Sequence, residues 1–118
     1  MHEFSVCQDL LRQVEELAHA HHARAVTTIR LQLGPLSGIE ASLLEQAFTV
    51  ARAGTVAATA VLMTEALPVR VRCRVCDVIS EVASNRLVCG SCGDWHTELM
   101  SGDELLLASV ELELEDNH

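Results

Sequence analysis

Apolar residues recur every three or four positions near the start of the chain, which is the spacing of a helix with one buried face. The pattern covers residues 5–22 approximately. Its apolar positions are Cys7, Leu10, Leu11, Val14, Leu17 and Ala18. Ser5 and Gln8 have the spacing of a capping box, so we expect the helix to begin near Ser5.

The period then changes to an alternation over residues 26–33, which predicts a half-buried strand that ends before a Gly-Pro pair. A second helical stripe follows, with apolar residues at Leu43, Leu44, Ala47, Phe48 and Ala51. Ser37 and Glu40 repeat the capping-box spacing at its start, and Gly54 is a natural C-terminal stop. A second strand is expected over residues 59–65 approximately.

The end of the chain alternates again, which predicts a long closing strand with one apolar and one acidic face. The apolar face holds Leu106, Ala108, Val110, Leu112 and Leu114, and the acidic face holds Glu111, Glu113 and Glu115. A strand, a helix and a strand joined by short connections form a right-handed crossover, so the first two strands are expected to be parallel neighbours. The closing strand completes a small mixed three-stranded sheet with two helices, an α/β (α+β) fold in which the first helix buries its stripe on the sheet.

Between the second strand and the closing strand, four of the five cysteines form two C-x-x-C pairs. The pairs are Cys73 with Cys76 and Cys89 with Cys92. Two intervening residues let a tight turn direct both sulfurs at one ion, and four thiolates complete a tetrahedral Zn(II) site without an open position. We therefore expect a structural zinc, with a disulfide or redox pair as the alternative. Residues 68–101 would form an inserted zinc-ribbon-like module, and residues 1–67 and 102–118 a discontinuous α/β domain.

Composition narrows the class of partner. At 118 residues the chain is one domain, or one domain with a small insertion. Eight basic against seventeen acidic residues give a net charge of −9, and aromatic residues make up 3% of the chain, so binding to nucleic acid or to an anionic membrane is disfavoured. Neither a signal peptide nor a membrane-spanning stretch is expected. Reduced cysteines in metal spacing then indicate a cytoplasmic protein.

Met1, His2 and Glu3 form a second candidate metal site. The α-amine, the backbone nitrogen of residue 2 and the His2 imidazole can enclose one metal in fused chelate rings, with a fourth position left open. Nitrogen-rich, tetragonal or square-planar coordination suits Ni(II) or Cu(II). A solvated terminal histidine is the simpler interpretation of the same residues. Glu3 could add a carboxylate ligand or cap the first helix.

Four more histidines and the fifth cysteine carry groups that can bind a metal. His96 follows Cys92 by four positions and is a candidate additional ligand for zinc or nickel. His19, His21 and His22 end the first helix, where a solvated helix end competes with an auxiliary metal patch. Cys7 lies on the apolar stripe and is expected to be a buried, inert thiol.

These features together resemble the HypA/HybF family, accessory proteins for nickel insertion into NiFe hydrogenases. The resemblance spans essentially the whole chain. It is carried by Met1-His2-Glu3-Phe4-Ser5, residues 29–40, Gly54-Thr55, the two C-x-x-C pairs and the closing Gly102-Asp103-Glu104-Leu105. The resemblance implies a nickel metallochaperone that binds Ni(II) at the Met1 amine and His2, holds Zn(II) on the four cysteines, and delivers nickel to a hydrogenase large-subunit precursor.

The resemblance also implies partners. These are a HypB-type GTPase and the hydrogenase large-subunit precursor, with urease maturation proteins as further candidates because some members serve urease. The chain has no Gly-rich phosphate loop, so nucleotide hydrolysis must lie with a partner and no enzyme activity is expected. We expect a monomer or weak homodimer.

The alternative function is a zinc-ribbon adaptor for protein or nucleic-acid binding, with no nickel role. The acidic balance and the few aromatic residues argue against nucleic-acid binding. A zinc deaminase also uses C-x-x-C, but its signature places a proline directly before the pair, and no proline precedes Cys73 or Cys89.

Overall fold

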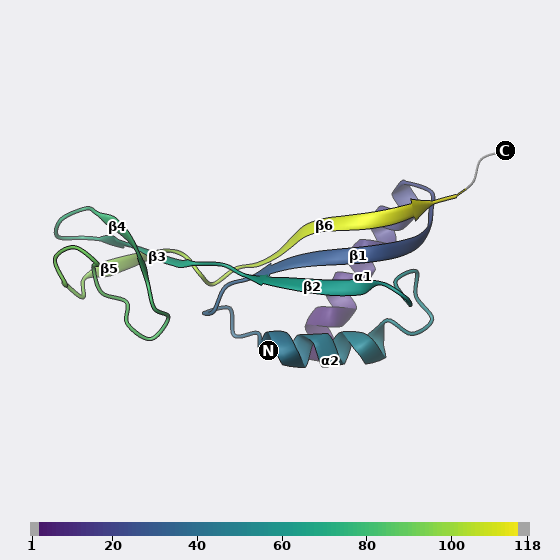
Figure 1. Ribbon diagram of the computed structural model, residues 1–118, viewed down its shortest axis with the longest axis horizontal. Helices are drawn as coiled ribbons and strands as arrows, with labels where there is room; N and C mark the ends of the chain where they lie inside the picture. The colour runs from purple at the N-terminus through teal and green to yellow at the C-terminus, as the bar shows by residue number, and fades with distance from the viewer. Residues whose placement is uncertain (1–2, 116–118) are drawn as a thin grey trace. The chain divides into compact units, whose positions relative to one another are not determined.

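The computed structural model describes residues 3–115, and Met1, His2 and residues 116–118 lie outside that description (Figure 1). The described residues form two compact units. The helical unit comprises residues 3–31, 39–65 and 107–115, and the cysteine unit comprises residues 32–38 and 66–106. Whether residues 68–101 fold as a separate domain stays a prediction.

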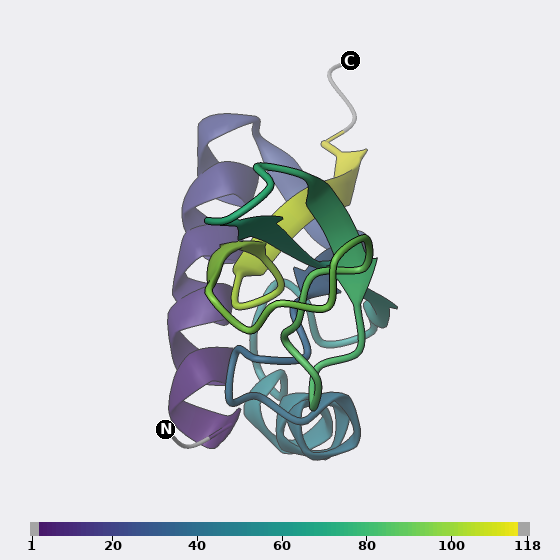
Figure 2. The ribbon, with the colours of Figure 1, turned by 90° about the vertical axis from the view of Figure 1, so that its left-hand side faces the viewer.

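The helical unit contains two helices and a three-stranded sheet. Its elements are α1 (Glu3–Ala20), α2 (Ala41–Ala51) and most of β1 (Ala23–Leu33), β2 (Val61–Ala66) and β6 (Leu105–Leu114). The strand order is β2-β1-β6, so β1 is central and the other two strands are edges. Both helices pack against the sheet, and Figure 2 shows α2 almost end-on beside α1, so the two helices cross steeply.

Hydrogen bonds give the direction of each strand. The Val26 N–H donates to the Val56 carbonyl at 3.0 Å, and the Leu67 N–H donates to the Leu33 carbonyl at 2.8 Å. Residues 26–33 and 56–67 therefore run in the same direction, and β1 and β2 are parallel. The Glu115 N–H, just after the end of β6, donates to the carbonyl of His22, just before the start of β1. The end of β6 therefore lies beside the start of β1, and the two strands are antiparallel. The predicted mixed sheet and α+β fold are confirmed.

The predicted apolar stripes build the core of the helical unit. α1 buries Cys7, Leu10, Leu11, Val14 and Ala18, α2 buries Leu44 and Phe48, and β1 contributes Val26, Ile29 and Leu31. Leu17 differs from its stripe neighbours, because 40% of it stays exposed. No residue of β6 is buried, although its apolar face was predicted from the alternation.

Both capping-box predictions are wrong. α1 already includes Glu3, so Ser5 lies inside the helix, and α2 begins at Ala41 with Glu40 as N-cap and no side-chain cap bond. The Glu40 N–H instead donates to a carboxylate oxygen of Glu3 at 3.4 Å. Residues far apart in the sequence therefore meet at the start of both helices, where a negative charge is favourable.

The cysteine unit contains a second three-stranded sheet. Its strands are β3 (Val69–Cys73), β4 (Ile79–Val82) and β5 (Thr97–Ser101), in the order β4-β3-β5 with both pairings antiparallel. Gly34 must be glycine here, because a Cβ atom would lie 2.1 Å from the carbonyl oxygen of Gly102. The close approach is fixed by the Leu36 N–H, which donates to that carbonyl at 2.7 Å.

Neither helix within residues 3–115 is long and apolar enough to cross a bilayer.

Candidate metal centre

The two C-x-x-C pairs form two turns of matching geometry. Cys73 ends β3 and Cys89 begins the second turn. In each turn two backbone N–H groups donate to the first sulfur, from Val75 and Cys76 to Cys73 Sγ and from Ser91 and Cys92 to Cys89 Sγ, at 3.3 and 3.4 Å in both cases. The residue after each pair takes a left-handed backbone, with φ of 63° at Asp77 and 77° at Gly93.

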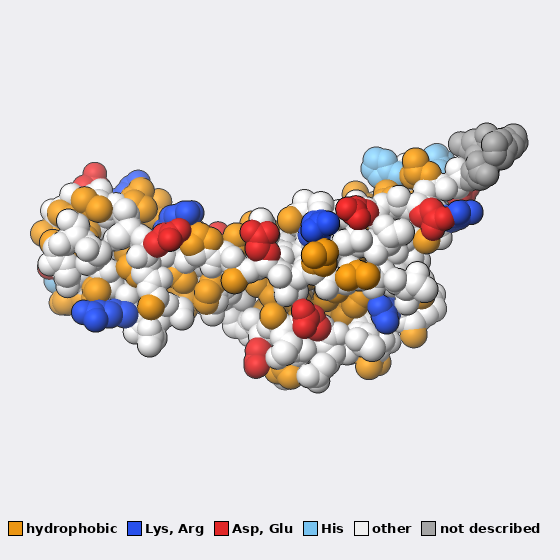
Figure 3. Space-filling model, in the orientation of Figure 1, with side chains coloured by type: hydrophobic (Ala, Val, Ile, Leu, Met, Phe, Trp, Pro, Cys, Tyr) orange, Lys and Arg blue, Asp and Glu red, His pale blue; other side chains and the backbone are white. Residues whose placement is uncertain are grey.

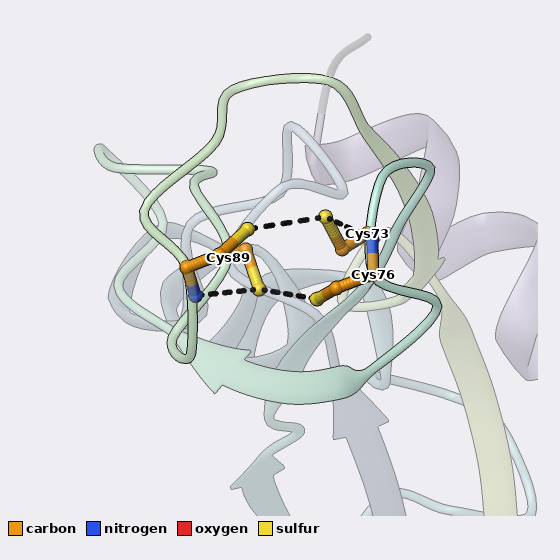
Figure 4. Close-up of side chains that lie close together, drawn as sticks. Cys73, Cys76 and Cys89 are labelled. Carbon is orange, nitrogen blue, oxygen red and sulfur yellow. Dashed lines mark hydrogen bonds between the residues drawn. The ribbon is translucent and has the colours of Figure 1, made fainter.

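The four sulfurs converge on one point. Cys73 Sγ lies 3.6 Å from Cys92 Sγ, and Cys76 Sγ lies 3.5 Å from Cys89 Sγ. All four sulfurs lie within 4.8 Å of one another (Figure 4). A tetrahedron with Zn–S bonds of about 2.3 Å requires sulfurs ~3.8 Å apart, so the arrangement fits Zn(II). All four cysteines are free thiols, which disfavours the disulfide alternative.

A zinc ion on these sulfurs would have a complete coordination sphere. Cys73 and Cys89 are buried and Cys76 and Cys92 are exposed, so the cluster lies at the surface. The four sulfurs would nevertheless fill all four positions of a tetrahedral site. Such a site holds two turns together and offers no place for a substrate. Its contribution is structural.

Backbone N–H donors lower the pKa of one of these thiols. The N–H groups of Cys92 and Ser91 stabilise the thiolate of Cys89 and lower its pKa from 9.0 to about 6. Cys89 is therefore mostly ionised at pH 7 before any metal binds. Cys7 shows the opposite behaviour in the helical unit, because burial raises its pKa to about 11 and its thiol donates to the Leu44 carbonyl. The predicted buried thiol is confirmed.

His96 is held by its neighbours rather than by the sulfurs. Its Nδ1 lies 2.7 Å from Asp94 Oδ1, which also accepts the His96 N–H, and these two bonds lower the pKa of Asp94. The Trp95 ring stacks on the imidazole with ring centroids 3.7 Å apart. Across residues 3–115 the four cysteines are the only group of three or more potential ligands, so neither His96 nor the histidines His19, His21 and His22 joins a described cluster.

The N-terminal candidate site is described only from Glu3 onward, because Met1 and His2 lie outside the described residues. Glu3 is the first described residue of α1 and contacts Glu40. The carboxylate of Glu40 accepts the Ser42 hydroxyl at 3.3 Å. The sequence does not identify Glu40 as a neighbour of Glu3, since no local pattern connects residues 37 positions apart.

Comparison with known proteins decides the family. The family model described as hydrogenase/urease nickel incorporation, metallochaperone, HypA matches residues 1–112. The chain belongs to the HypA family. A hydrogenase maturation factor HypA from Nitrosospira multiformis is 46% identical over 112 residues, covering 95% of this chain and 97% of that protein. The corresponding factor from Aquifex aeolicus is 39% identical over 115 residues, covering 98% and 100%.

Solved structures agree with the family. The solution structure of the nickel metallochaperone HypA from Helicobacter pylori superposes with a TM-score of 0.71 at 28% identity, covering 98% of this chain and 100% of that chain. A second solution structure, of a HypA protein, gives 0.74 at 28% identity, with 98% of both chains covered.

Family membership confirms the resemblance to HypA, the nickel and zinc expectation and the nickel-metallochaperone function in hydrogenase maturation. Members of this family are maturation factors rather than enzymes. The zinc-ribbon adaptor without a nickel role is accordingly not favoured. The ligand assignments at the terminus and at the cysteines stay predictions.

Proposed function

We propose that the protein binds its nickel cargo through the α-amine of Met1 and the imidazole of His2, and that Cys73, Cys76, Cys89 and Cys92 hold a structural zinc. The observation that carries the nickel proposal is the opening Met1-His2-Glu3 in a chain of the HypA family. An amine, an amide and an imidazole are nitrogen donors of the kind that Ni(II) prefers. An open fourth position suits an ion that must be passed on.

Two carboxylates next to the terminus support this assignment. Glu3 accepts the backbone N–H of Glu40, so both acidic residues lie where the chain enters α1. Within the described residues neither carboxylate takes part in an ion pair. Their negative charge is therefore available to favour a cation at the terminus, either as a ligand or by orienting one. His96 remains a candidate additional ligand.

Calorimetric titration of Ni(II) into matched variants tests the ligand set. We expect His2→Ala to lose measurable nickel affinity while its zinc content is unchanged. His19→Ala removes another histidine from the helical unit and should bind nickel like the wild type. Glu3→Gln and Glu40→Gln should weaken binding roughly 10-fold each if they act as supporting groups. Wild-type affinity in His2→Ala would refute the assignment.

The proposed recipient is the large-subunit precursor of a NiFe hydrogenase, with a HypB-type GTPase supplying nucleotide hydrolysis. The family's part in hydrogenase maturation supports this recipient, and the family description supports urease maturation proteins as further candidates. Tagged precursor lacking nickel should retain this protein in a pull-down, and precursor already loaded with nickel should retain less. Equal retention by both would contradict a delivery role.

We further propose that the protein acts in the cytoplasm as a monomer or weak homodimer, with residues 68–101 as the zinc module. Free cysteines in a metal cluster support a reducing compartment. Sedimentation at micromolar concentration tests the oligomeric state, and a single tight dimer would contradict it.

A further inference from the structure

The edge strand β6 leaves apolar surface uncovered. Leu106 is 45% exposed near the start of the strand and Leu114 is 60% exposed at its end, whereas Leu107, Val110 and Leu112 are half-buried. Leu17, the one uncovered position of the α1 stripe, lies against the same strand. Leu17 and His21 of α1 enclose a hollow of about 260 Å³ with the segment of β6 from Leu107 to Leu112. Some apolar side chains of β6 and α1 are thus left uncovered by the part of the chain that the structure describes.

Among residues 3–115, no strand pairs with the outer edge of β6, so this edge carries backbone groups without a strand partner. The Glu115 N–H donates to the carbonyl of His22, which directly precedes β1, and the Glu111 carbonyl accepts the hydroxyl of Thr27 on β1. Glu111 and Glu115 thus direct these backbone groups toward β1. In an antiparallel pairing alternate residues bond to one neighbour, so the N–H groups of Val110, Leu112 and Leu114 point to the free edge. An edge strand of this kind is a template for an added strand.

Charge on the opposite face of the strand restricts what can be added. Glu113 pairs with Arg24 and Glu111 lies 3.6 Å from Arg30, so β1 places a positive side chain beside each glutamate on one side only. Figure 3 shows acidic and basic side chains interspersed on this face of the sheet. An added strand would place its own side chains on the other side of the two glutamates, where arginine or lysine would be favourable and a carboxylate unfavourable.

A second copy of this chain fits that requirement poorly. The described residues of the helical unit hold ten acidic residues and four arginines, a net charge of −6. Two such units would repel each other, and two β6 strands would bring their glutamates to the same seam. The edge therefore favours a basic partner over self-association.

We propose that the free edge of β6 binds an extended segment of a partner protein as a fourth strand, with apolar side chains toward the α1 hollow and alternating arginine or lysine side chains beside Glu111 and Glu113. Main-chain hydrogen bonds would supply affinity and the two faces would supply specificity. This surface is separate from the nickel assignment and does not depend on it.

The test uses a fluorescein-labelled eight-residue peptide in which valine and arginine alternate. Two control peptides are the block isomer, with four valines followed by four arginines, and the alternating valine–glutamate peptide. By fluorescence anisotropy at physiological salt, the alternating valine–arginine peptide should bind at least 10-fold more tightly than either control. Equal binding of the block isomer would show non-specific attraction and overturn the proposal.

Variants locate the site. Glu111→Gln with Glu113→Gln should weaken the peptide at least 5-fold, whereas Glu15→Gln with Glu16→Gln changes the net charge equally on α1 and should not. Amide hydrogen exchange gives an independent readout in the wild-type chain. On peptide binding the amides of Val110, Leu112 and Leu114 should become protected. Protection elsewhere, an equal effect of both variant pairs, or concentration-dependent protection of these amides without peptide would each overturn the proposal.

Discussion

Removal of zinc should unfold the cysteine unit and leave the helical unit folded. Only three aliphatic side chains of the cysteine unit are buried among the described residues, namely Leu33, Val69 and Val71. At ~1.5–3 kcal/mol each they contribute roughly 5–9 kcal/mol, whereas structural zinc on thiolates contributes ~10–16 kcal/mol. Zinc is therefore the larger stabilising contribution in this unit.

Amide hydrogen exchange before and after treatment with a chelator is the assay for that prediction. The amide of Val71, in the central strand β3, should lose its protection when zinc is removed, while the amide of Ile29 in β1 should keep it. Cys89→Ser should behave like the chelated wild type. Cys7→Ala is the matched control, because it removes a buried cysteine from the helical unit and should retain about one zinc per chain. Protection of Val71 that survives complete zinc removal would show that the cysteine unit folds without zinc.

Three further predictions concern protons and packing. Because backbone N–H groups lower the pKa of Cys89 to about 6, zinc binding should release more protons in total at pH 5 than at pH 7, which calorimetry in buffers of different ionisation enthalpy measures. Gly34→Ala should destabilise the protein by about 2 kcal/mol or more in thermal unfolding, because its Cβ would meet the Gly102 carbonyl. Gly38→Ala is the control for this substitution, because its Cβ would meet open space and its φ of 80° should cost only ~1–2 kcal/mol. Phe48→Ala should cost ~3–5 kcal/mol in denaturant unfolding.

Patterns that depend on neighbouring residues could be predicted from the sequence. The C-x-x-C spacing places two sulfurs on one turn whatever the rest of the chain does, which is why the cysteine cluster was predicted and is present. The helical stripes and the alternation of β1 are likewise local, and the α+β fold followed from them.

Features that depend on tertiary contacts could not be predicted in this way. The Glu40 N–H is satisfied by Glu3 from another helix, so the capping boxes predicted at Ser5 and Ser37 misplace both helix starts. Leu17 has the right spacing for burial, but it lies beside an edge strand where none of the described residues covers it fully. Periodicity indicates which side chains are suited to burial, but it does not indicate whether another helix or strand lies over them.

Selective modification of the N-terminal amine tests the nickel assignment most directly. The chain contains no lysine, so the α-amine of Met1 is its one primary amine and can be acetylated without altering any side-chain amine. Acetylation removes a nitrogen donor but leaves His2, Glu3 and the four cysteines intact. We predict that acetylated protein keeps its zinc and binds Ni(II) more than about 10-fold more weakly than mock-treated protein. Unchanged nickel affinity after complete acetylation would exclude the α-amine of Met1 as a nickel ligand.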